Sequence, residues 1–114
     1  VADALLERMQ REVERCDRLG ALLAFSSVAG GTGSGLGSHA LGVVQEAFPS
    51  TPLVSISVWP FQSGEVSVQS YNAALSLAAA YECADMVLLC ENERYLELCR
   101  SALREQRPSM VSLN

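Results

Sequence analysis

The glycine-rich stretch AGGTGSGLGSHALG, residues 29–42, holds the residue types best suited to chemistry. Glycines let several successive main-chain N–H groups point at one anion without obstruction by a Cβ atom. A helix that starts there adds its positive N-terminal end, and Thr32 and Ser34 add hydroxyl donors. The stretch therefore predicts a phosphate-binding loop.

Three kinds of glycine loop compete for this stretch. A P-loop requires the pattern G-x-x-x-x-G-K-[ST], and the chain contains no lysine. Residues 35–40, GLGSHA, fit the dinucleotide fingerprint G-x-G-x-x-A, but they lie inside an expected helix and no acid ends the next strand. A plain turn explains some of the glycines but not the hydroxyls. A nucleotide-binding protein, a small Rossmann-type oxidoreductase domain and an interaction module with a vestigial nucleotide site all remain open.

The sequence offers no catalytic group or metal site beside the loop. The only histidine, His39, has no acid or nucleophile at a useful spacing, and we expect it to be structural. The cysteines Cys16, Cys83, Cys90 and Cys99 form no C-x-x-C pair. They are expected to be buried, reduced thiols.

Composition excludes several classes of protein. The chain has 114 residues, 49% of them hydrophobic and 18% charged, which suits one globular domain. A net charge of -5 argues against a nucleic-acid partner, and no apolar run is long enough to cross a bilayer. The start, VADALLERMQ, lacks an initiator methionine and a signal sequence, so we expect a fragment.

Helical and strand patterns alternate along the chain, as crossover units of a parallel sheet require. Helices are expected at residues 3–19, 34–48, 67–81 and 93–104, and strands at 21–28, 53–58 and 86–90. The inward face of the third helix is expected to carry Val68, Tyr71, Ala74, Leu75 and Ala78. The predicted class is α/β, a Rossmann-like parallel sheet with helices on both faces. Ligands of such sheets bind in the loops that follow the strands, here 29–34, 59–66 and 91–93.

Three motifs in order carry a resemblance to the tubulin superfamily. AGGTGSG (29–35) resembles its GGGTGSG signature, VQSYNAALS (68–76) resembles VEPYNATLS, and CENERYLELC (90–99) resembles IDNEALYDIC. WPFQSGEVSVQSYN (59–72) is most similar to the delta class. The resemblance implies that residues 1–114 are part of a tubulin-type GTP-binding domain, from before the glycine-rich loop to the start of the central helix.

The resemblance also implies roles for individual residues. The phosphates of GTP would be held by Ser27, Gly30, Gly31, Thr32, Gly33, Ser34 and Gly35. Glu65 and Gln69 would lie at the ribose; the amide of Gln69 replaces the usual glutamate and loses its charge-assisted bond. Asn92 and Asn114 would contact guanine, because an amide offers both a donor and an acceptor. Asn92 could instead cap a helix, and Met110 replaces an aromatic ring that stacks on the base.

The implied cofactor is GTP, with Mg²⁺ as an accompanying ion. The implied partners are other tubulins in longitudinal head-to-tail contact, in the cytoplasm and cytoskeleton, including centrioles or basal bodies. Tubulins hydrolyse GTP when a neighbouring subunit supplies an acidic loop, which lies outside these residues. We expect the 114-residue chain by itself to bind GTP weakly or not at all and to show no GTPase activity.

Overall fold

The computed structural model describes residues 1–61, 67–102, 104, 108–109 and 111. Its elements in chain order are α1 (Ala2–Val13), β1 (Leu22–Ser27), the π-helix η1 (Thr32–Leu36), α2 (Gly37–Ala47), β2 (Leu53–Trp59), α3 (Gln69–Cys83), β3 (Met86–Glu91) and α4 (Asn92–Ala102). No helix in this described part combines the length and the hydrophobicity that a membrane crossing needs.

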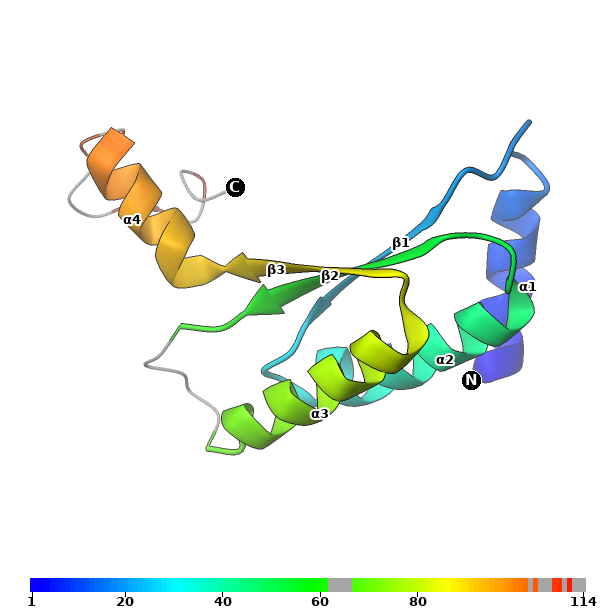
Figure 1. Cartoon of the computed structure of the whole chain (residues 1–114), viewed down its shortest axis with the longest axis horizontal. Coiled ribbons are helices and arrows are strands. Elements are labelled where there is room, and N and C mark those ends of the chain that lie inside the picture. The colour runs from blue at the N-terminus through cyan, green and yellow to red at the C-terminus, as the bar shows by residue number, and fades with distance from the viewer. Residues whose placement is uncertain (62–66, 103, 105–107, 110, 112–114) are drawn as a thin grey trace.

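The three strands form a parallel sheet in the order β1-β2-β3. Leu22 pairs with Leu53, and Val54 pairs with Met86. The crossovers through α2 and α3 both advance in the same direction across the sheet, so right-handed connections put both helices on one face. Figure 1 shows α2 and α3 side by side along the sheet, with α1 beside α2. The predicted α/β class with a parallel sheet is confirmed.

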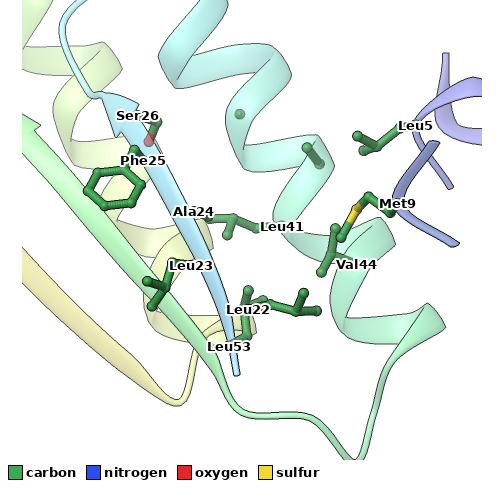
Figure 2. Close-up of a pocket in the computed structure, with 12 residues that line it drawn as sticks. Leu5, Met9, Leu22, Leu23, Ala24, Phe25, Ser26, Leu41, Val44 and Leu53 are labelled. Atoms are coloured by element: carbon green, nitrogen blue, oxygen red, sulfur yellow. The ribbon is translucent and has the colours of Figure 1, made fainter. Parts of the chain in front are cut away.

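The core lies between the sheet and α2. Leu41 and Val44 of α2, Leu53 of β2 and Ala80 of α3 are buried together, and Leu5 and Met9 of α1 pack against them. A pocket of about 230 Å³ remains between α1, β1 and α2. Figure 2 shows that most of its lining side chains are aliphatic, with Met9, Phe25 and Ser26 beside them, and none of the lining residues is charged. This pocket therefore offers nothing that would bind a polyanion.

The sheet face opposite α2 and α3 is apolar and open among the described residues. Leu23 and Phe25 of β1 are 60% and 70% exposed, and they alternate with residues that face α2. The register sets Val54 and Met86 beside Leu23, and Ile56 and Leu88 beside Phe25. α4 continues from the end of β3 (Figure 1). The open face is thus apolar, whereas the face toward α2 and α3 carries Ser55 and Ser57 of β2. The expected helices on both faces are not seen among the described residues, because α2 and α3 lie on one face.

The prediction that the first helix reaches residue 19 is wrong, because α1 ends at Val13. The N–H groups of Arg15 and Cys16 bond the carbonyls of Glu12 and Val13, three residues back, which tightens and closes the last turn. The apolar spacing continues to Leu19, but Asp17 and Gly20 disfavour helix there. Cys16, expected to be buried, is exposed, while Cys99 is the one fully buried thiol of the four.

The predicted inward face of the third helix is also wrong. Val68, Tyr71 and Leu75 are exposed, and the buried positions of α3 are instead Ala73, Ser76 and Ala80. Spacing identifies a helical face but does not tell which face packs when both are largely apolar. Small side chains on the buried face let α3 approach the sheet and α2 closely.

Replacing Leu41 by alanine tests the core. Leu41 is only 5% exposed, so L41A should lower the free energy of unfolding by about 2–5 kcal/mol. The matched control is Gln45→Ala on the exposed side of the same helix, which should change it by less than about 0.5 kcal/mol. Urea unfolding followed by circular dichroism measures both, and equal losses would contradict this placement of α2.

Candidate functional site

The glycine-rich loop lies at the carboxyl edge of the sheet, directly after β1. Val28 is 1% exposed and donates its N–H to the carbonyl of Val58 at 3.2 Å, so the chain is fixed to β2 until that point. Residues 29–31 then leave the sheet, and the π-helix η1 starts at Thr32. The helix was expected to start near Ser34. The chain thus passes from strand to helix within a few residues.

Gly33 is the glycine that packing demands. A Cβ atom at this position would lie 2.1 Å from the carbonyl oxygen of Ser27, at the end of β1. A Cβ on Gly30, Gly31 or Gly35 would meet no protein atom within 4 Å. Gly33 therefore permits the close approach of helix and strand, while the other three glycines leave open space beside the main chain.

The N–H groups of residues 30–33 are not used by the fold among the described residues. The N–H of Ser34 bonds the Gly30 carbonyl at 3.0 Å, and that of Ala29 approaches Ser27 Oγ at 3.4 Å. The four N–H groups between them have no acceptor in the described part of the chain, as expected at the start of a helix. Gly31 and Thr32 are exposed. This arrangement suits an anion, which the helix N-terminus would also favour.

The remaining predicted phosphate contacts differ in their exposure. Gly35 and Ser27 are exposed, whereas Ser34 is 8% exposed and its carbonyl accepts a hydrogen bond from Ser38 Oγ. A cavity of about 430 Å³ adjoins the loop, and Ser27, Thr32 and Gly33 contribute to its lining. The loop therefore borders open volume on one side and packed protein on the other.

The first turn of α3 donates hydrogen bonds to the segments that directly follow β1 and β2. Asn72 Nδ2 donates to the carbonyl of Ala29 at 2.8 Å, and Gln69 Nε2 donates to the carbonyl of Phe61 at 3.1 Å. Gln69, predicted to lie at the ribose, thus already has a main-chain partner. Asn72 lies in the VQSYNAALS motif, but sequence reasoning gave it no role, because a contact across 43 residues leaves no local pattern.

Asn92 is the first residue of α4 and directly follows β3, at the same edge of the sheet as the glycine-rich loop. It is half-buried, and its amide makes no hydrogen bond within the described part of the chain. In the same turn, a hydrogen bond with Cys90 and the closeness of that thiol raise the pKa of Tyr95 above its ordinary value. Glu65, Met110 and Asn114, the other predicted site residues, lie outside the described residues.

Comparison with known proteins shows the family of the chain. A family model described as "Tubulin/FtsZ family, GTPase domain" matches residues 1–100, which include the sheet, the glycine-rich loop and Asn92. The chain belongs to the Tubulin/FtsZ family. The dinucleotide fingerprint is not supported, because residues 35–40 lie within η1 and α2 and not in a turn between strand and helix.

Similar proteins come from several tubulin classes. The chain is 35% identical to a tubulin delta chain of Mus musculus over 98% of its length, which is 25% of that protein. It is 36% identical to a tubulin beta-1 chain of Colletotrichum graminicola and 35% identical to a tubulin alpha-1 chain of Arabidopsis thaliana, over all of this chain and 26% of each. The chain spans about a quarter of these relatives. Identity alone does not separate the classes.

A pair of glycine variants tests the close approach at Gly33. Gly33→Ala should lower the free energy of unfolding by about 1–3 kcal/mol, because helix or strand must move to relieve the contact with Ser27. Gly31→Ala is the control: its backbone is right-handed helical and open, so stability should stay the same or rise by about 0.4–1 kcal/mol. Urea unfolding measures the free energy of unfolding of both variants. Equal stabilities would show that the strand–helix junction is looser than described.

Proposed function

We propose that this chain is part of the GTP-binding domain of a tubulin-type cytoskeletal protein, and that residues 29–35 bind the nucleotide phosphates. The observation that carries the proposal is the row of N–H groups at residues 30–33, at the junction of β1 and η1, that have no acceptor among the described residues. Uncharged donors suffice here, because they are local and the net charge of -5 is distributed and screened. Thr32 adds an exposed hydroxyl, and Mg²⁺ would accompany the triphosphate.

Asn92 would read the guanine edge from the end of the neighbouring strand β3. Carboxyl ends of parallel strands share one edge, so a ligand held by the loop after β1 can extend across β2 toward α4. The half-buried amide of Asn92 would supply a donor and an acceptor. In this proposal Asn114, Met110, Glu65 and Gln69 complete the guanine and ribose contacts.

The finer proposal is a delta-type tubulin with a role at centrioles or basal bodies. It is supported by the WPFQSGEVSVQSYN segment and by the tubulin delta chains among the relatives. Longitudinal head-to-tail contact with other tubulins would be its mode of association. The domain would comprise residues 1–114 together with further segments.

Nucleotide competition in the complete natural protein that contains these residues tests GTP binding. Asn92→Ala should weaken GTP binding about tenfold and ATP binding little, because it removes base contacts. Thr32→Val should weaken both by about fivefold, because it removes one phosphate donor and leaves the base contacts intact. Displacement of a fluorescent GTP analogue measures both variants. Thr51→Val, away from the loop, is the matched control and should leave both affinities unchanged.

Two outcomes would contradict the proposal. A wild-type protein that binds no guanine nucleotide would favour an interaction module with a vestigial site. A GTP-to-ATP preference that Asn92→Ala leaves unchanged would remove Asn92 from the guanine site while leaving the phosphate loop in place.

Cellular location tests the delta assignment. The tagged complete protein should concentrate at centrioles or basal bodies. Fluorescence microscopy with a centriolar marker measures this. A uniform signal along all microtubules would contradict the delta assignment but not the family.

A further inference from the structure

Asn72 makes the one long-range side-chain hydrogen bond to the glycine-rich loop among the described residues. Its Nδ2 donates to the Ala29 carbonyl at 2.8 Å, although the two residues are 43 positions apart. Ala29 directly precedes Gly30 and Gly31, whose N–H groups have no acceptor among the described residues. Asn72 therefore contacts the loop from α3, at a half-buried position.

Asn72 is itself firmly held in α3. Its N–H bonds the Val68 carbonyl at 3.0 Å, and its own carbonyl accepts from Ser76 Oγ at 2.7 Å. Ser76 is buried. The amide group thus projects from a fixed point of the helix, so it can define the position of the loop and does not simply follow it.

Because a peptide group is planar, the contact with Asn72 also fixes the orientation of the Gly30 N–H. The described chain has no cis peptide bond, so the Ala29 carbonyl and the Gly30 N–H point in opposite directions across one plane. Because the Ala29 carbonyl accepts a hydrogen bond from Asn72 of α3, the Gly30 N–H is turned away from α3. A hydrogen bond to the carbonyl also strengthens the N–H of the same peptide as a donor.

We propose that Asn72 is a positioning residue for the phosphate-binding loop: it turns the Ala29–Gly30 peptide so that the Gly30 N–H faces the nucleotide phosphates. The proposal rests on the proposed function. It adds a second anchor to the junction at Gly33, so that the loop is fixed at its entrance by α3 and at its exit by Ser27 of β1. Asn72 acts through the main chain and does not touch the ligand.

The test compares GTP with guanosine in the complete natural protein. Asn72→Ala should weaken GTP binding about tenfold, because one phosphate donor is misdirected, and should leave guanosine binding unchanged. Asn72→Asp keeps the shape but cannot donate when ionised, so its loss for GTP should be at least as large. Ser70→Ala, at an exposed position in the same first turn of α3, is the matched control, and GTP affinity should stay at the wild-type value.

Hydrogen exchange in the nucleotide-free protein gives an independent readout. Asn72→Ala should speed amide exchange at residues 28–34 and leave β2 and β3 unchanged, whereas a general loss of structure would speed exchange everywhere. Unchanged GTP affinity and loop exchange, or an equal loss for GTP and guanosine, would overturn the positioning role. Wild-type protein that fails to bind GTP would instead overturn the proposed function, and faster loop exchange in Asn72→Ala would still support the anchor.

Discussion

The close contact between Gly33 and the carbonyl of Ser27 is the constraint on which the site depends. Because no side chain fits between them, the start of the helix can sit directly on the end of β1. The chain then has only residues 28–31 in which to leave the sheet and turn into η1. Within this short passage the N–H groups of Gly30 and Gly31 have no acceptor among the described residues, which is what an anion site requires.

A second constraint is the small size of the side chains beneath the loop. Ser55 and Ser57 of β2 are 1% exposed and satisfy each other through a hydroxyl contact of 3.2 Å. Ala73 and Ser76 of α3 are buried as well. Buried hydroxyls are tolerated because each finds a hydrogen-bond partner. Because these buried side chains are small, α3 lies close enough for the Asn72 amide to reach the glycine-rich loop.

The sequence was most informative where a pattern is local. Hydrophobic runs bounded by glycine and proline located the strands to within one residue, and the glycine cluster located the loop. Sequence alone did not show that Gly33, among several glycines, carries the steric requirement, because that depends on where Ser27 lies in space. The buried face of α3 was missed because large apolar residues such as Tyr71 and Leu75 were expected inside, whereas close packing selected Ala73 and Ala80.

The open face of the sheet affects how these residues behave in solution. Leu23, Phe25 and Leu88 form part of a continuous apolar surface, and β1 is an edge strand within the described sheet. Sulfate and other salts that strengthen apolar burial usually stabilise a protein. Here they would also promote self-association through this surface, because contact between two such faces removes apolar area from water. A buffer with a low concentration of a salt that strengthens apolar burial only weakly should therefore keep these residues in solution better than sulfate.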